Sequence, residues 1–189
     1  MWALVESGSV TNIYTRPKQL TIGDIKYPSN IFTLWSASEL ESLGIYLVII
    51  DNSNYKNPEY YVNTNQSFTF ADNKVTATYG TATAKPLDDT TVDGKIVKGV
   101  RPYKLVQIDN QAYGLLQPND WMVVKATETG GSVASDWTTY RAAVRTTAND
   151  MKTKINAAST IDELAALYEY NNAEPPVRPL GEFPTPPTS

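Results

Sequence analysis

The 189-residue sequence contains no cysteine and no histidine, and these two absences remove several kinds of chemistry. Without cysteine there is no disulfide, no thiol nucleophile and no thiolate metal ligand. Without histidine there is no Ser-His catalytic pair, no imidazole ligand and no histidine-based pH switch. Only carboxylate pairs remain as candidate acids and bases. We therefore predict that the chain is not an enzyme and has no catalytic residue, no metal ligand and no cofactor.

Charged side chains are also scarce, at 19% of residues, and the formal net charge is −4. Nucleic-acid binding requires clustered lysine and arginine, so we expect no nucleic-acid partner. The longest apolar run, residues 45–50, is far shorter than the ~20 residues of a membrane span, so no span is expected. The first six residues lack the basic and apolar regions of a secretion signal. Three neighbouring carboxylates, Asp88, Asp89 and Asp93, do not have the spacing of a calcium loop.

Aromatic and small polar residues are abundant instead. Twelve tyrosines and four tryptophans accompany frequent Thr, Asn and Ser, a mixture that suits β-structure and hydrated protein surfaces. The length fits one domain or two small subdomains. We predict an α+β fold with an antiparallel β-rich N-terminal subdomain, a subdomain of short helices and an extended proline-rich tail, at residues 1–98, 99–171 and 172–189.

The β-rich subdomain is predicted to contain one short helix, at about residues 36–43. Ser36 and Glu39 have the spacing of a capping box, and Gly44 is placed to end the helix in the left-handed conformation. Strand formers lie on both sides of the helix, and the run at residues 45–50 is typical of a buried strand. Other strands are expected at residues 2–5, 19–25, 60–62, 67–70 and 75–79, with hairpin turns at Asp72-Asn73 and Asp93-Gly94.

Four helices are predicted in the second subdomain. The first begins near Pro102, and apolar residues recur along it at helical spacing, at Leu105, Ile108, Ala112 and Leu116. Asn119 and Asp120 cap a short helix to about residue 127, which Gly130-Gly131 ends. Ser135 and Asp136 cap the longest helix, about 136–157, whose apolar stripe is Trp137, Tyr140, Val144, Ala148, Met151 and Ile155. A capping box at Thr160 and Glu163 opens the last helix.

Proline rules out helix after Asn171, because six prolines fall within the next seventeen residues. Such a segment is extended or polyproline II, and it is solvated unless something covers it. We expect the tail to be covered by a partner, and disorder is the alternative.

Residues of the longest helix and of the segment before it resemble a known family. The pattern is Asn119-Asp120-Trp121, then Glu128-Thr129-Gly130, then Trp137-Thr138-Thr139-Tyr140-Arg141 and Arg145. It is similar to the C-terminal segment of bacteriophage tail-fibre assembly and related tail-associated virion proteins, which often end in a proline-rich tail. The resemblance covers about residues 100–170. It implies a location in the virion tail, after synthesis in the host cytoplasm, and contacts with fibre or baseplate subunits in several symmetric copies.

The candidate partner-binding residues lie on the longest helix and in the tail. They are Trp137, Tyr140, Arg141, Arg145, Pro176, Arg178, Phe183 and Pro184. The alternative for the aromatic residues is packing within the helical subdomain. The alternative for the arginines is a solvated helix face with local ion pairs, such as Asp136 with Arg141. Trp35, Tyr60 and Tyr61 either stack on sugars or pack within the sheet.

The function that we predict is a structural component of a phage tail, a fibre or baseplate accessory protein. It would bind other virion chains through its helices and tail. Three alternatives stay open: an assembly chaperone that is not retained in the particle, a host-surface carbohydrate-binding module, and a small hydrolase with two carboxylates in a cleft.

Overall fold

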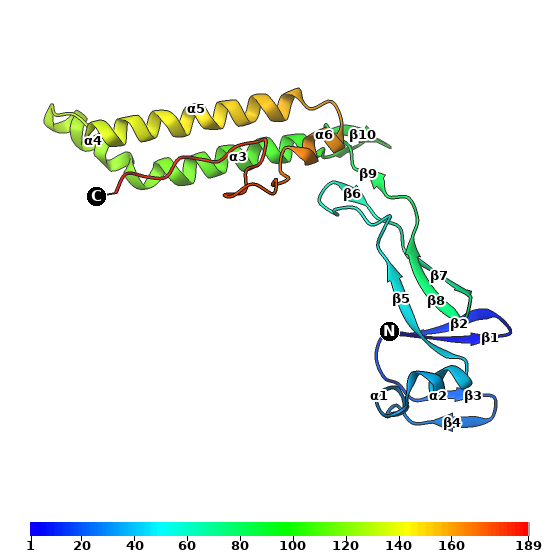
Figure 1. The fold of residues 1–189 in the computed structure, drawn as a ribbon. Helices are drawn as coiled ribbons and strands as arrows, with labels where there is room; N and C mark the ends of the chain where they lie inside the picture. The colour runs from blue at the N-terminus through cyan, green and yellow to red at the C-terminus, as the bar shows by residue number, and fades with distance from the viewer. Residues whose placement is uncertain (189) are drawn as a thin grey trace. The chain divides into compact units, whose positions relative to one another are not determined.

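The computed structural model describes residues 1–188 and divides the chain into two compact units, Met1–Thr83 and Ala84–Ser189. We call them the sheet unit and the helical unit. Together they form an α+β protein, as the sequence predicted (Figure 1). The division lies between Thr83 and Ala84, within the short strand β9 (Thr83–Ala84), whereas the sequence interpretation set it near residue 98.

The sheet unit is built on five strands in the order β2-β1-β5-β8-β7. β5 and β8 run parallel, and the other neighbours are antiparallel. The edge strands β2 and β7 approach each other, so the sheet curls. The strands are β1 (Trp2–Glu6), β2 (Ser9–Tyr14), β5 (Ile45–Asp51), β7 (Gln66–Ala71) and β8 (Lys74–Tyr79), and the short β6 (Tyr61–Val62) lies outside the sheet.

Alternation along the strands gives this sheet two apolar faces. On one face Leu4 and Ile45 pack against a cover made by α1 (Ile31–Leu34), α2 (Ala37–Ser42) and the hairpin of β3 (Leu20–Ile22) and β4 (Ile25–Tyr27). The other face, inside the curl, buries Ala3, Val48, Val75 and Ala77.

The turns and caps of the sheet unit follow the sequence closely. The Ser36–Glu39 capping box forms, and the hairpin turn at Asp72 and Asn73 has positive φ at both residues. Gly44 follows α2 with φ +78°, and a Cβ there would lie 2.6 Å from the backbone oxygen of Val5. A side chain at this position would therefore push β1 away from the end of the helix.

Two strand predictions in this unit were wrong. The expected strand 19–25 is a hairpin, because Gly23 adopts φ +58° and separates β3 from β4. The run 45–50 is a strand but is buried only in part, since the cover formed by the helices ends at Ile45. Leu47 and Ile49, further along the same face, are 64% and 49% exposed, and Ile50 on the other face is 51% exposed.

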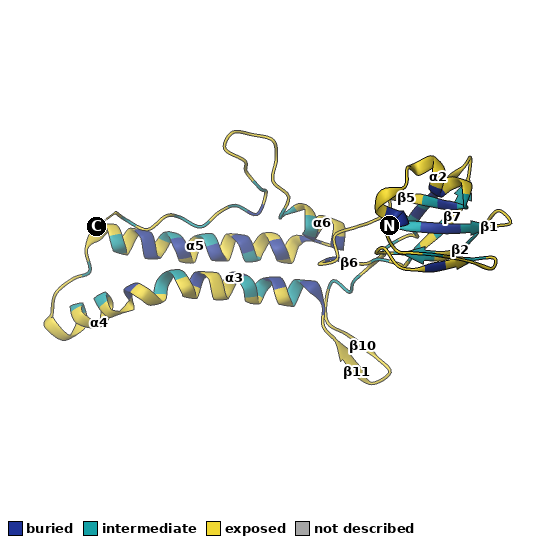
Figure 2. Ribbon diagram, turned by 90° about the horizontal axis from the view of Figure 1, so that it is seen from below, coloured by how far each residue is buried: buried dark blue, intermediate teal, exposed yellow. Residues whose placement is uncertain are grey.

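The helical unit is a hairpin of two long helices, α3 (Val100–Leu116) and α5 (Ser135–Ala157), which run side by side (Figure 1). Buried residues lie along their facing sides, as Figure 2 shows. A short β-hairpin precedes α3, with the positive-φ turn predicted at Asp93-Gly94. The remaining elements are β10 (Thr90–Val92), β11 (Lys95–Val97), the 3-10 turn η1 (Gln117–Asn119), α4 (Asp120–Thr129) and α6 (Ile161–Ala166).

The inward residues of α3 recur every fourth position, at Val100, Lys104, Ile108 and Ala112. Lys104 replaces the predicted Leu105 on this face, and its ammonium group lies 4.1 Å from the ring centre of Tyr168. The aliphatic stem and the cation–π contact make lysine acceptable there. On α5 five residues of the predicted stripe, Tyr140, Val144, Ala148, Met151 and Ile155, are buried, whereas Trp137 at its start is half-buried.

The caps of α5 and α6 differ from the prediction. The N-cap of α5 is Ala134, and neither Ser135 nor Asp136 caps the helix. At α6 the Thr160 hydroxyl accepts from the Glu163 amide as expected. The Glu163 carboxylate, however, accepts from the Ser159 amide, one residue before the N-cap. The capping box is therefore half formed.

The tail packs on the helical unit itself. Residues 172–188 contain no helix or strand. They first complete the loop that follows α6, and the rest of the segment runs along the helix hairpin toward α4 in both ribbon views (Figures 1 and 2). Leu180 is 1% exposed, and its amide donates to the Leu167 carbonyl at 2.9 Å. The Lys154 ammonium donates to the carbonyls of Pro179 and Leu180 at 2.8 and 3.2 Å. At Leu180 the cover that the sequence led us to expect from a partner is thus supplied by the chain itself, whereas most of the other described tail residues are exposed.

None of the helices within residues 1–188 has both the length and the apolar content needed to cross a bilayer.

Candidate protein-binding site

Arg141 of α5 lies at the centre of a polar cluster where α3 turns into α4. Its guanidinium donates to the Leu116 carbonyl at 3.0 Å, to the Asn119 side-chain oxygen, and to the Asp120 carboxylate at 2.6 Å. Asn119 in turn donates to the Leu115 carbonyl at 3.0 Å. We call Arg141, Leu116, Asn119 and Asp120 the arginine joint. It binds the end of α3, the 3-10 turn and the start of α4 to one side chain of α5.

The chemistry of the joint requires arginine. Arg141 and Asn119 are 8% and 4% exposed, so their polar atoms need partners within the protein. The planar guanidinium presents five donors in a fixed arrangement, and one side chain can therefore reach a carbonyl, an amide and a carboxylate together. The Asp120 side chain is 53% exposed, so solvent screens part of the ion pair.

The sequence predicted different partners for these residues. Asn119 and Asp120 were expected to cap α4, but the Asn119 side chain makes no cap hydrogen bond and joins Arg141 instead. Arg141 was expected to face a carboxylate of a partner or of Asp136, and the Asp136 prediction was wrong. An Asn-Asp pair before a helix looks the same in sequence whether it caps the helix or binds an arginine. The sequence therefore contained no signal that distinguishes these two roles.

Next to the joint, α4 displays apolar side chains to solvent. None of its ten residues is buried, and Trp121 and Val124 are 56% and 55% exposed (Figure 2). Gly130, in the left-handed conformation at φ +67°, ends the helix and turns the chain toward α5. We call this region, residues 115–141, the hairpin tip.

The hairpin tip carries an open pocket of about 330 Å³ lined by residues of α4 and the start of α5. Trp121 lines it from one side and Trp137 from the other, with Lys125 as its charged lining residue. Trp137 is half-buried, and its ring meets Tyr140 edge-on at 5.8 Å. Tyr140 is buried beneath it and holds the Trp137 ring in place rather than facing the pocket. Two aromatic rings beside an open apolar pocket are typical of protein contact sites.

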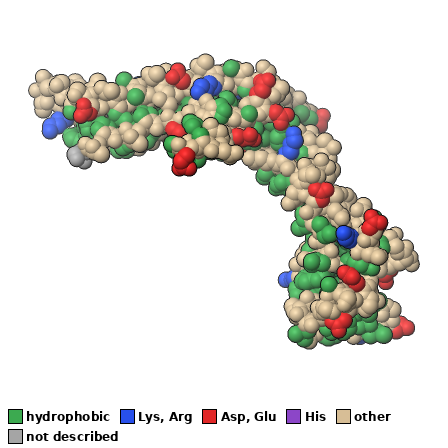
Figure 3. All heavy atoms as spheres, viewed as in Figure 1, with side chains coloured by type: hydrophobic (Ala, Val, Ile, Leu, Met, Phe, Trp, Pro, Cys, Tyr) green, Lys and Arg blue, Asp and Glu red, His purple; other side chains and the backbone are tan. Residues whose placement is uncertain are grey.

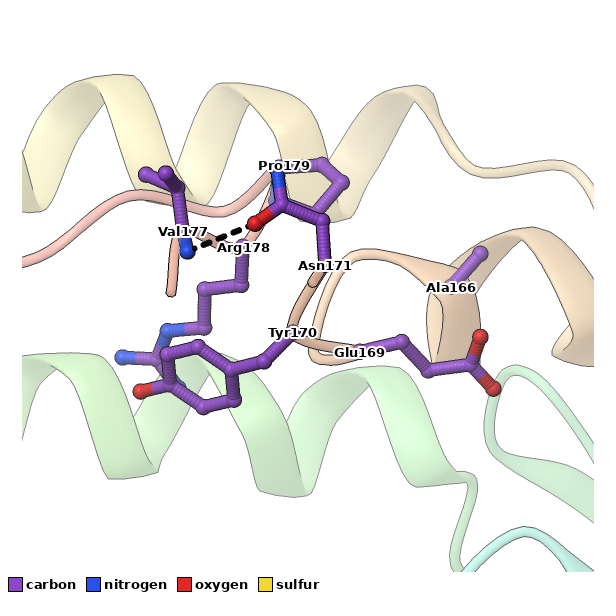
Figure 4. A pocket seen from close by; sticks show the side chains of 7 residues that line it. All are labelled: Ala166, Glu169, Tyr170, Asn171, Val177, Arg178 and Pro179. Atoms are coloured by element: carbon purple, nitrogen blue, oxygen red, sulfur yellow. Dashed lines mark hydrogen bonds between the residues drawn. The ribbon is translucent and has the colours of Figure 1, made fainter. Parts of the chain in front are cut away.

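A second pocket, of about 450 Å³, lies in the loop after α6, toward the other end of the hairpin (Figure 4). The Asn171 side-chain oxygen accepts from the Val177 and Ala173 amides at 3.0 and 3.1 Å and holds the loop closed. Arg178 pairs with Glu182 at 2.7 Å, so its charge is balanced within the chain. The Tyr170 hydroxyl donates to the same carboxylate at 2.6 Å, and this hydrogen bond raises the pKa of Tyr170.

The eight predicted partner-binding residues therefore fall into four places. Trp137, Tyr140 and Arg141 belong to the hairpin tip, and Arg145 is exposed one turn further along α5, with its guanidinium 3.3 Å from the Arg141 carbonyl. Pro176 and Arg178 lie in the loop after α6. Phe183 and Pro184 are half-buried in the tail.

The other polar and aromatic candidates serve the fold. Tyr60 and Tyr61 are buried, so they present no platform to a sugar. Trp35 meets the ring of Tyr27 edge-on at 6.0 Å. Asp88 pairs with Arg101 at 2.8 Å and Asp89 with Lys98 at 2.6 Å, at the base of the β10–β11 hairpin.

Lysine and arginine are scattered singly among carboxylates on the face drawn in Figure 3. Comparisons with protein-family models, with curated proteins and with solved structures find no match to this chain.

Proposed function

We propose that this protein is a structural component of a phage tail, a fibre or baseplate accessory protein that binds other virion chains through the hairpin tip. The observation that carries the proposal is the exposed helix α4, with Trp121 beside the tip pocket. An aromatic side chain on a rigid support loses little conformational entropy on binding, which makes it an effective contact residue.

The sequence resemblance supports the same site. The residues that carry it, Asn119, Asp120, Trp121, Trp137 and Arg141, come together at the hairpin tip although they span 23 positions of the chain. The resemblance also supports a location in the virion tail, and several copies related by the symmetry of the particle. The proposal assigns the protein no catalytic step, no cofactor and no nucleic-acid partner.

Mass spectrometry of purified particles of the phage that encodes the chain tests this function. A retained component is expected at a constant ratio to the tail subunits, with the copy number measured from peptide intensities. The assembly-chaperone alternative predicts the opposite: the protein would co-purify with the fibre from infected cells and be absent from finished particles. Absence from both samples contradicts both functions.

One observation favours carbohydrate binding as a second candidate. The tip pocket combines two indole rings with the hydroxyl-bearing residues Thr129 and Ser132, a combination that sugar sites use. Titration of the protein with host-surface glycans, read by tryptophan fluorescence, distinguishes this candidate. If a glycan shifts the emission and Trp121→Ala removes the shift, the tip contacts sugar rather than protein.

A further inference from the structure

Helix α3 has a second apolar face, opposite to the one that packs on α5. Tyr103, Val106 and Tyr113 are 58%, 55% and 60% exposed, and Asn110 between them is exposed as well. These four residues are spaced by three, four and three positions. At about 100° per residue they fall on a stripe about 80° wide, on the side away from Val100, Lys104, Ile108 and Ala112. We call them the α3 seam.

The spacing of the α3 seam is that of a helix that pairs with another helix. Apolar residues repeating every three and four positions form the contact line of a coiled coil. A single polar Asn on such a line fixes the register and the number of helices, because it is satisfied best by a second Asn across the interface. The α3 seam has Asn110 at its centre, with an apolar residue on either side.

We propose that a second copy of this chain covers the α3 seam, with α3 paired antiparallel to its counterpart and Asn110 facing Asn110. In this arrangement Val106 of each copy meets Tyr113 of the other, so a small side chain opposes a large one. The two carboxamides complete each other, because each has a donor and an acceptor.

The net charge of the chain opposes self-association, and this repulsion is smallest at the uncharged α3 seam. The chain carries a formal net charge of −4, so two copies repel each other over most of their surface. The four seam residues are uncharged, and the neighbouring Asp109 is paired with Lys152 of α5 at 2.8 Å. Gly114 lies beside the seam with open space where a side chain would be, which leaves room for a facing Tyr ring.

The area that the proposed dimer would bury sets its expected affinity. An aromatic side chain presents about 150–250 Å² in total, so two seams with their polar neighbours remove on the order of 1,000 Å² from water. Specific interfaces begin at about 1,000–1,200 Å². We therefore expect a dimer with a dissociation constant in the micromolar range rather than the nanomolar range.

Sedimentation velocity of the full chain, from about 1 to about 200 µM, tests the proposal. The wild-type protein is expected to pass from monomer to dimer across this range. Asn110→Asp places two carboxylates face to face, and its dimer is expected to weaken at least ~10-fold. The matched control is Gln111→Glu, the same change one residue along α3 and off the seam, which is expected to leave dimerisation unchanged. Far-UV circular dichroism checks that both variants keep the helix content of the wild type.

A charge exchange identifies the facing residue. Asn110→Asp and Asn110→Lys are each expected to be monomeric, and an equimolar mixture is expected to return to dimer at low salt. A wild-type protein that stays monomeric up to the highest concentration overturns the proposal. So does an Asn110→Asp variant that dimerises like the wild type, or a mixture that fails to pair. These variants leave Trp121 and Arg141 intact, so their failure has no bearing on the function proposed for the hairpin tip.

Discussion

Among the residues that the structure describes, the buried side chains of the sheet unit are all apolar or tyrosine. The helical unit also buries Lys104, Asn119 and Arg141. In the sheet unit the backbone ladders set the register, and alternation assigns each side chain to a face. Two packed helices have no such ladder and can slide or rotate on apolar surfaces. A buried arginine that needs three particular partners favours one arrangement of α3, α4 and α5. The arginine joint therefore contributes mainly to the geometry of the helical unit, and the apolar contacts contribute most of its stability.

The two units also differ in which segments build their cores. The sheet unit closes within its own strands and short helices. The helical unit also uses the tail, because Leu180 is 1% exposed and Lys154 of α5 donates to the Pro179 and Leu180 carbonyls. The tail is therefore a packing element of this unit rather than an appendage.

The largest expected effects come from one buried residue in each unit. Ile45→Ala in the sheet unit and Leu180→Ala in the tail each remove a side chain that is at most 1% exposed. Each is expected to cost about 2–5 kcal/mol of unfolding free energy. Hydrogen exchange read by mass spectrometry should show faster exchange in the unit that carries the change and little change in the other. If Leu180→Ala costs less than about 1 kcal/mol, the tail does not belong to the core of the helical unit.

A smaller effect is expected when the arginine joint is removed. Arg141→Met keeps the apolar stem but leaves the buried Asn119 without its donor, at a cost of about 2–3 kcal/mol. The control is Lys152→Met, which breaks the more exposed ion pair with Asp109 and is expected to cost under ~1 kcal/mol. Chemical denaturation followed by helical ellipticity measures both changes. Equal costs would mean that the joint contributes no more than a surface ion pair.

The smallest effect concerns pH at the base of the β10–β11 hairpin. The pKa of Asp89 is lowered, first by the hydrogen bond from Lys98 and then by that from the Gly99 amide. A lowered pKa means that the contribution is present above the unfolded value of about 3.9 and is lost as the pH falls through the lower, folded value. The Gly99 amide signal in NMR should therefore shift only below about pH 4. In Asp89→Asn this shift should be absent, and a shift that persists would assign the titration to another carboxylate.

Local signals predicted much of the fold. The capping box at Ser36 and Glu39 and the turns at Asp72-Asn73 and Asp93-Gly94 depend on residues within four positions of one another, and all three form. The α5 stripe was also predictable, because helical spacing is a property of the segment itself.

The rest depended on contacts between distant segments. The partners of Arg141 lie 21 and 22 positions away, and nothing in the local sequence separates them from Asp136. The exposure of Leu47 follows from where the cover of α1 and α2 ends, not from the apolar run in which it lies. The burial of Leu180 requires knowing that the tail folds back on α5. For the candidate site, Trp137 and Arg141 were both named from the sequence. Arg141 was expected to be available to a partner, but its side chain is buried.

The central claim is that Trp121, presented by the hairpin tip, is a contact residue for another virion chain. The most direct test is the amount of Trp121→Ala protein in purified particles, compared with wild type and with Ile96→Ala, which changes an exposed apolar residue on the β10–β11 hairpin. Both variants should fold normally, since exposed substitutions usually change stability by less than about 0.5 kcal/mol. The account predicts normal incorporation of wild type and Ile96→Ala and a loss of at least ~10-fold for Trp121→Ala, as for a contact residue that contributes more than about 1.4 kcal/mol. Equal incorporation of all three proteins would contradict it.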